Sequence, residues 1–223
     1  MSLFHPSSPA WAPISDSQFM KARLQGNAWR PEHDPDVILR GMALPFYPGH
    51  RLIMARCPHW KPESTALYWL VGSSDIYPLS GVSPPIHEAN EKSGQRITRE
   101  TALAYLIFFC HFVHGEEGPF AILESLDNPY LPPAPKHARD PNAVESRELR
   151  LLTLRHQSPR YHGTDADGNF RYSATMLYSD AIFLADLLIH PGGMVEMRDD
   201  TPLITNLSFR AVAPLTLARE FQP

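Results

Sequence analysis

The stretch that begins at Thr98 constrains the fold of this chain more than any other, because it reads as one long apolar helix. No Gly or Pro interrupts it between Thr101 and Val113, and Gly115 is a stop signal directly after it. Thr98 is the predicted N-cap, and Glu100 in the first turn suits the positive end of the helix dipole. The sequence therefore predicts a helix of about seventeen residues.

Apolar side chains cover most of the circumference of this predicted helix. At 100° per residue, only a narrow stripe is left for water, and it carries Glu100, Ala104, Ile107, His111 and His114. Such a helix must be covered on nearly every side, so we expect a central core element. Its apolar run of about twelve residues is well short of the roughly 20 that a membrane span needs, so we expect no transmembrane segment and no membrane partner.

Composition and charge narrow the class of protein. The chain has 223 residues, 43% of them hydrophobic, which is ordinary for a globular protein. Its 23 prolines are about twice the usual share and favour strands, turns and extended arms. The net charge is -4 and no basic cluster is visible, so we expect no nucleic-acid partner. The start lacks a secretory signal pattern and the two cysteines form no disulfide framework, so we expect a reducing, cytoplasmic setting.

Short strands and turn signals fill most of the remaining sequence. Three runs around a Pro/Gly turn predict an antiparallel meander, and later runs separated by Asp-Gly and Gly-Gly predict hairpins. The predicted strands are 37–44, 50–57, 65–72, 119–126, 148–156, 160–163, 169–178, 181–190 and 194–199, and 209–218 is expected to close an edge. Short helical segments are expected at 15–24, capped by Ser15 or Asp16, and at 86–92.

The strand predicted at 181–190 is apolar on both faces, which is typical of a central strand covered on both sides. Asp186 interrupts one of these faces. Because burying an unpaired carboxylate costs several kcal/mol, we expect Arg171 or Arg198 on a neighbouring strand to pair with it.

Together these patterns predict an α+β fold, with a curved antiparallel sheet of about seven to eight strands packed around one long central apolar helix. We expect a Pro-rich N-terminal arm over residues 1–35 and a single α+β domain over 36–213. The domain carries a Pro-rich excursion at 127–146, and residues 214–223 form a C-terminal tail.

Titratable side chains gather where the predicted central helix ends, at His111, His114, Glu116 and Glu117. One interpretation is an acid/base cluster, or a metal held by His111, His114 and Glu117. The other, which we favour, is that both histidines point to water along the polar stripe and interact with the helix dipole. The two glutamates do not fit a purely dipolar account, because anions are unfavourable at a helix C-terminus.

The long loop predicted at 73–95 holds the second set of candidates, Asp75, His87 and Glu88. An imidazole beside a carboxylate serves as a general base when both meet a substrate together, and the alternative is a capping arrangement in a short helical turn. Loops of this length inside a compact domain are usually functional or excursions over the surface.

Known catalytic and cofactor motifs are absent from the sequence. There is no P-loop, G-x-G-x-x-G or G-x-S-x-G, and the turn at Asp165 fails as a calcium loop because Met176 stands where a bidentate Glu is needed. We therefore expect no cofactor and no metal, and favour a non-enzymatic module for a small-molecule ligand or a protein partner, with homo-oligomerisation left open. The alternative is a hydrolase or lyase that uses His87 with Glu88 or the His/Glu-bound metal. A polypeptide-binding edge strand near the C-terminus is a third interpretation.

Overall fold

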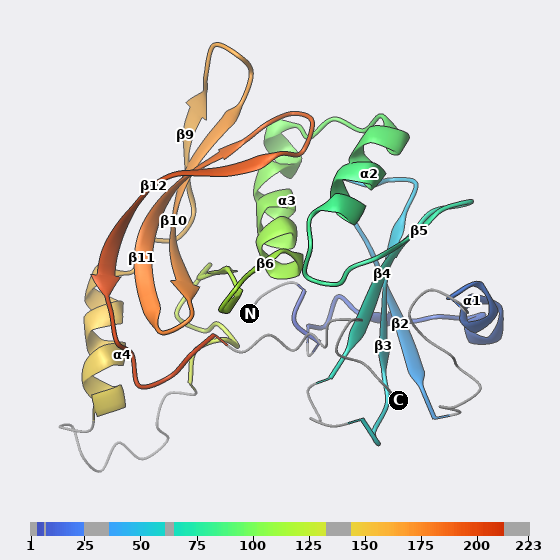
Figure 1. The fold of residues 1–223 in the computed structure, drawn as a ribbon, viewed down its shortest axis with the longest axis horizontal. Helices are drawn as coiled ribbons and strands as arrows, with labels where there is room; N and C mark the ends of the chain where they lie inside the picture. The colour runs from blue at the N-terminus through green and yellow to red at the C-terminus, as the bar shows by residue number, and fades with distance from the viewer. Residues whose placement is uncertain (1–3, 7, 25–35, 61–64, 133–143, 212–223) are drawn as a thin grey trace. The chain divides into compact units, whose positions relative to one another are not determined.

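The structure is a computed structural model that describes residues 4–6, 8–24, 36–60, 65–132 and 144–211 (Figure 1). The chain divides into two compact units. Among the described residues, the N-terminal unit comprises those between His5 and Gln95, and the C-terminal unit comprises Phe4 and those between Arg96 and Ala211. Each unit contains its own antiparallel sheet, so the predicted α+β class with antiparallel sheets is confirmed.

The predicted arrangement of strands needs a correction. In place of one curved sheet, the described strands form two five-stranded sheets and one two-stranded sheet. The reason lies in residues 73–95, predicted as a loop with a short helical segment at 86–92. That segment is confirmed as α2 (Pro84–Ser93), which lies beside the edge of the first sheet, but Ile76–Pro78 forms β5, which completes that sheet. The two compact units meet in the sequence at Gln95 and Arg96, inside the region predicted as one domain over 36–213. The outer limits of that region, 36 and 213, stay a prediction.

The sheet of the N-terminal unit is an antiparallel meander in chain order, β1 to β5. Its other strands are β1 (Ala12–Pro13), β2 (Ile38–Ala43), β3 (Arg51–Arg56) and β4 (Leu67–Val71). The predicted three-stranded meander is thus confirmed in β2, β3 and β4. One face packs on α1 (Ser17–Leu24) through an apolar cluster that includes Leu24 and Trp69. The Phe19 N–H donates to Asp16 Oδ1 at 3.0 Å, which confirms Asp16 as the cap of α1.

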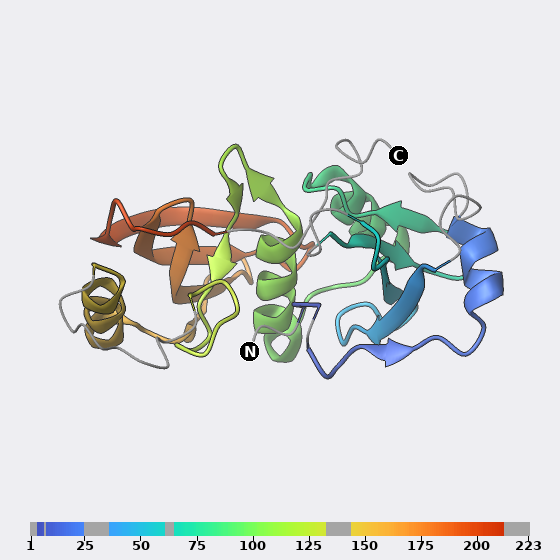
Figure 2. The same cartoon turned by 90° about the horizontal axis from the view of Figure 1, so that it is seen from below.

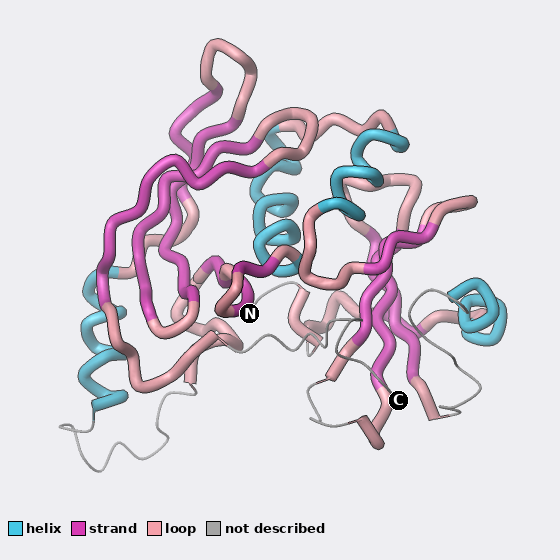
Figure 3. The backbone as a smooth tube through the Cα atoms, viewed as in Figure 1, coloured by secondary structure: helices cyan, strands magenta, loops and turns pink. Residues whose placement is uncertain are grey.

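The C-terminal unit contains the longest described strands. Its five-stranded sheet has the order β12-β11-β10-β8, with β9 also paired to β10, and β6 and β7 form a separate two-stranded sheet. The elements are α3 (Arg99–Phe112), β6 (His114–Gly115), β7 (Gly118–Pro119), β8 (Ala121–Ile122), α4 (Val144–Arg155), β9 (Arg160–Thr164), β10 (Phe170–Tyr178), β11 (Ala181–Ile189) and β12 (Val195–Ile204). Figure 3 shows β10, β11 and β12 side by side. The predicted Gly-Gly turn joins β11 to β12, and Ser179 and Asp180 join β10 to β11.

Helix α3 begins where the sequence predicts. The Thr98 N–H donates to Thr101 Oγ1 at 3.0 Å within a capping box, so Thr98 is the N-cap. The helix ends at Phe112, two residues earlier than predicted, because His114 enters β6. It is one of four described helices, and a place at the centre of a single sheet is not shown. No helix in the described part of the chain has the length and apolar character needed to cross a bilayer.

The two faces of the C-terminal sheet are covered by different helices. On one face α3 lies over the sheet, and on the other Leu152 of α4 packs with Leu177 and Ile182. Helix α4 also lies beside β12 (Figures 1 and 2). Strand β11 lies between β10 and β12, as predicted for a central strand. Arg171, one of the two predicted partners, is 3.4 Å from Asp186, whose side chain is partly exposed.

Helix α4 replaces the strand predicted at 148–156. Its sequence is rich in Leu, Arg and Glu, which are good helix formers, and Thr153 is the one β-branched residue between 148 and 156. The apparent alternation of Leu with polar residues therefore misled the prediction. Of the edge segment predicted at 209–218, residues 209–211 lie outside any strand, and the rest lies outside the described residues.

Candidate functional site

A groove of about 500 Å³ lies on one face of the N-terminal sheet, where β2 begins and β3 ends. Its volume falls within the roughly 300–1,000 Å³ typical of small-ligand sites. The lining combines two cationic side chains with apolar ones: Pro6, Ile38, Arg40, Met54, Arg56, Cys57 and Pro58. This composition suits a ligand with an anionic group and an apolar part.

The register of β2 and β3 places these side chains together. Ile38 lies opposite Arg56, and Arg40 lies opposite Met54. Because residues two apart along a strand share a face, all four point to the same side of the sheet. Arg40 and Arg56 are diagonal neighbours, which in antiparallel pairs lie roughly 7–8 Å apart. Their long side chains can therefore meet one small anion, with buried Met54 between them as an apolar floor.

The N-terminal segment forms a rim of the groove. The Ser8 N–H and the Trp11 indole N–H both donate to the His5 carbonyl, at 2.8 and 3.0 Å. The Trp11 ring is buried and lies 5.9 Å from the ring of Tyr68 on β4. These contacts fix the turn that carries Pro6, so the groove has a defined wall on this side.

The electrostatics of the groove favour an anion. Within the described residues, the Arg40 side chain makes no hydrogen bond or ion pair. The carboxylate of Asp36 pairs with His59 at 3.1 Å. Burial, and then the positive charge of Arg56, lower the pKa of His5. A bound carboxylate or phosphate would receive charge-assisted hydrogen bonds from the guanidinium groups. Ile38, 55% exposed, offers apolar surface beside them.

The candidates predicted in residues 73–95 lie around β5 and α2 of the same unit. Asp75 sits in the turn before β5, where its carboxylate accepts a hydrogen bond from Ser74 Oγ at 2.9 Å. Glu88 lies on α2 and pairs with Lys92 at 2.7 Å, one helical turn later. His87 lies on α2 and is partly buried. None of these three residues lines the arginine groove.

Asp75 and Glu88 are brought together around the buried phenol of Tyr77. Lys92 lies 5.8 Å from the centre of the Tyr77 ring. Burial first, then the negative charge of Asp75 and that of Glu88, raise the pKa of Tyr77, while Lys92 opposes them. Burial also lowers the pKa of His50, against the effect of Asp75. Tyr77 belongs to β5 and packs beside Lys92 of α2, so this buried side chain helps to join the two elements.

His111 does not point to water, contrary to the favoured interpretation. It is 3% exposed, and its Nδ1 shares a 2.7 Å hydrogen bond with the hydroxyl of Tyr130. Its ring packs edge-on against Phe112 at 4.7 Å and lies 6.0 Å from Phe4. The stripe that the sequence left for water is therefore covered at this position by Phe4 and by the segment around Tyr130.

The other candidates at the end of α3 do not lie with His111 in the core. His114 lies in β6, Glu116 is exposed in the following turn, and Glu117 pairs with Arg210 at 3.4 Å. Among the residues that the structure describes, no group of three or more His, Cys, Asp or Glu side chains could hold a metal ion. His111, His114 and Glu117 therefore do not form a metal site in this structure.

The sequence analysis did not single out Arg40 and Arg56. The signal that could have found them is their placement within the predicted strands 37–44 and 50–57, where each occupies a polar position next to apolar ones. Pairing these strands in the observed register brings the two arginines to one face. The sequence alone did not fix that register.

Comparisons with known proteins add no family to this description. No protein-family model, no curated protein and no solved structure matches the chain. The geometry of the groove is therefore the basis for assigning it a role.

Proposed function

We propose that the N-terminal unit binds a small anionic ligand that also has an apolar part, such as an aromatic or alkyl carboxylate or phosphate. The observation that carries this proposal is the pair of arginines, Arg40 and Arg56, on one face of a groove of about 500 Å³ with an apolar floor. This role agrees in class with the expected non-enzymatic ligand-binding module. The hydrolase or lyase alternative stays untested.

The expected affinity follows from the size of the contact. A hydrogen bond to a charged group contributes about 1.5–3 kcal/mol, and the groove is open, so water and salt weaken the attraction. A ligand of fragment size then binds with a Kd of roughly 0.1–1 mM. Natural ligands with a larger apolar part would bind more tightly, because the groove offers the exposed Ile38 and two prolines to cover.

Thermal unfolding with a matched set of compounds tests the proposal. We expect phenyl phosphate and phenylacetate to raise the midpoint by about 3–5 °C at ten times their Kd, because each binds the folded state alone. The neutral benzyl alcohol and the cationic phenethylamine should give no shift. Equal shifts with all four compounds, or a shift with phenethylamine alone, would contradict an anion site.

A further inference from the structure

Helix α4 presents an unusual surface on its outer side. Leu154 is 82% exposed and Leu151 is 43% exposed, and Arg147 and Arg150 are exposed beside them. At 100° per residue, these four positions share one face of the helix. The opposite side is anchored, because Leu152 is buried in the core. The outer face of α4 therefore presents two exposed leucines, Leu151 and Leu154, flanked by two exposed arginines.

The anchoring contacts hold this face in place. Glu148 accepts hydrogen bonds from the Ser208 N–H at 3.0 Å and from Ser208 Oγ at 2.6 Å. At the other end of α4, Arg155 Nη1 donates to the Leu203 carbonyl of β12 at 2.6 Å. Arg155 is thus engaged within the unit, while Arg147 and Arg150 are exposed.

A complementary hollow of about 100 Å³ lies on the same sheet of the same unit. An acidic rim surrounds an apolar floor, and the lining includes Ser173, Leu184, Asp186, Asp199, Asp200 and Thr201. Leu184 alternates with Ile182, which packs under α4, so Leu184, Asp186 and the facing Asp199 lie on the α4 face of the sheet. Asp200 lies opposite Ala185 and alternates to the other face. The volume is close to that of one leucine side chain.

The acidic rim is unfavourable in a single copy of the chain. Asp186 lies directly opposite Asp199 across β11 and β12, and like charges in that position destabilise a sheet. Arg171 reaches Asp186 at 3.4 Å. Within the described residues, neither Asp199 nor Asp200 pairs with a cation. A cationic surface placed over this rim would relieve the repulsion.

We propose that these two surfaces bind each other between two copies of the chain, so that the protein forms a symmetric dimer through its C-terminal unit. Leu154 of one copy occupies the hollow of the other, and Arg147 and Arg150 meet Asp186 and Asp199. Because both surfaces lie on one face of one sheet, a two-fold axis gives each helix a hollow, and the assembly closes at two copies.

The expected dimer is weak. A helix of 12 residues is about 18 Å long and about 10 Å wide, so two such contacts bury roughly 800 Å² in total. Stable dimers usually bury about 1,200 Å² or more. We therefore expect a Kd of roughly 10–500 μM that rises with salt, because the arginine–aspartate contacts are exposed at their edges.

Sedimentation velocity of the full chain over about 10 μM to 1 mM tests the proposal. Leu154→Glu and Arg150→Asp should each raise the dimer Kd at least tenfold, and Arg150→Asp combined with Asp199→Arg should restore it to within threefold. The matched control is Phe19→Glu, an exposed apolar position on α1, which should leave the Kd within twofold. Circular dichroism establishes that each variant is folded.

Three results would overturn the dimer. The first is a wild-type chain that stays monomeric up to about 1 mM, which would leave the α4 surface to a different partner. The second is a dimer that Leu154→Glu does not weaken, and the third is a dimer that Phe19→Glu weakens as strongly. None of these results bears on the arginine groove, whose ligand is tested separately.

Discussion

The hydroxyl of Tyr130 and the Nδ1 of His111 share a 2.7 Å hydrogen bond inside the C-terminal unit. Both side chains are buried, and burial raises the pKa of the Tyr130 phenol. The bond joins α3 to a segment 19 residues later that has no regular secondary structure. It therefore stabilises a part of the fold that no strand or helix pairing holds.

Removing the hydroxyl in Tyr130→Phe should lower the free energy of unfolding by about 1–3 kcal/mol, because it takes a hydrogen-bond partner from a buried imidazole nitrogen. Urea unfolding measures the change. The matched control is Tyr161→Phe, whose hydroxyl bonds Thr164 at 2.6 Å in an exposed setting and should cost less than about 0.5 kcal/mol. Equal losses in the two variants would contradict a structural role for the buried bond.

Gly115→Ala should destabilise the C-terminal unit. A Cβ at this position would lie 2.5 Å from the Tyr178 hydroxyl and 3.0 Å from its ring. That ring is stacked on Phe120 at 4.3 Å, and its hydroxyl accepts the Glu117 N–H at 3.0 Å, so it cannot move freely. We expect a loss of about 1–3 kcal/mol.

Gly49→Ala is the control for this substitution, because a Cβ at Gly49 meets no atom within 4 Å. Urea unfolding should show a change within about 0.5 kcal/mol for the control. If the alanine at position 115 is tolerated as well as the one at position 49, the packing described around Tyr178 is wrong.

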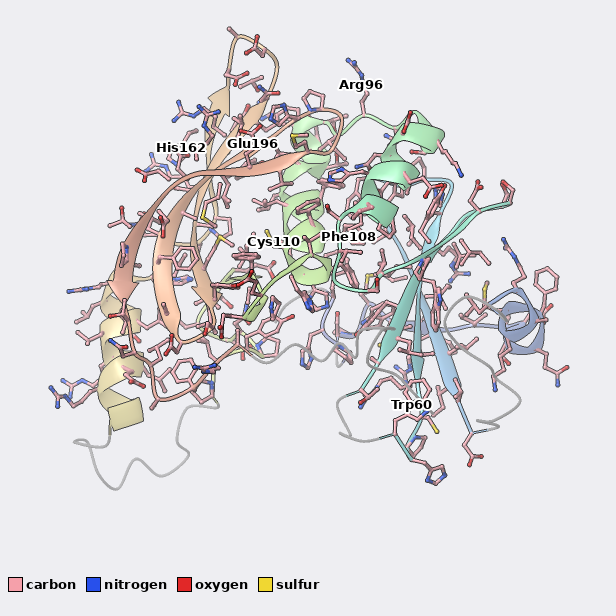
Figure 4. All side chains as sticks on the ribbon, in the orientation of Figure 1. Trp60, Arg96, Phe108, Cys110, His162 and Glu196 are labelled. Atoms are coloured by element: carbon pink, nitrogen blue, oxygen red, sulfur yellow. The ribbon has the colours of Figure 1, made fainter. Side chains whose placement is uncertain are left out.

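Cys110 on α3 (labelled in Figure 4) should resist alkylation in the folded protein. Burial raises the pKa of its thiol to about 12. Only about one molecule in ten thousand then carries the thiolate at pH 8, and the thiolate is the reactive form. Mass spectrometry after timed iodoacetamide treatment should show this cysteine reacting at least about a thousand times faster in urea-unfolded chain. Similar rates in the two states would contradict its burial.

Stability should fall as the pH drops below neutral, in part because of His50. Burial lowers the pKa of His50 below its ordinary value of 6.5. At mildly acidic pH, His50 therefore binds a proton in the unfolded chain but not in the folded chain. The stability from this neutral imidazole is complete above pH 6.5 and is lost as the pH falls from there through the lowered pKa. The burial of His5 acts in the same direction.

His50→Gln tests this dependence. Urea unfolding at pH 7.5 and at pH 5.5 should show a smaller difference between the two conditions in the variant than in the wild-type chain. A difference as large as in the wild type would show that His50 does not contribute. The loss of the ring also frees space next to Gly72, where a Cβ would lie 2.8 Å from His50 Nε2.

Local sequence patterns predicted local structure well, and they failed where distant segments meet. Thr98 was found as the N-cap and Asp16 as one of two caps of α1, because capping depends on residues three positions apart. The meander and the later hairpins were predicted correctly because each pairs strands that are neighbours in the sequence. The segment from Glu148 to His156 was misread because Leu spaced for a helix face also resembles strand alternation over so short a length.

Local sequence patterns could not predict the contacts that define the candidate site. Arg40 and Arg56 share a face only in the observed register, and the loop between β2 and β3 is too long to fix a register by turn type. The same limit hid the partner of His111, since Tyr130 carries no periodic signal. Asp75 and Glu88 were singled out, but their meeting around Tyr77 depends on how α2 packs beside β5.

Calorimetric titration of phenyl phosphate tests the central claim most directly. The wild-type chain should bind with a Kd of roughly 0.1–1 mM, and Arg40→Gln and Arg56→Gln should each weaken binding at least about tenfold. Arg51→Gln removes the same charge from the opposite face of β3 and should change the Kd less than about twofold. Equal weakening by all three substitutions would reduce the effect to net charge, and no binding to the wild-type chain would contradict the groove as an anion site.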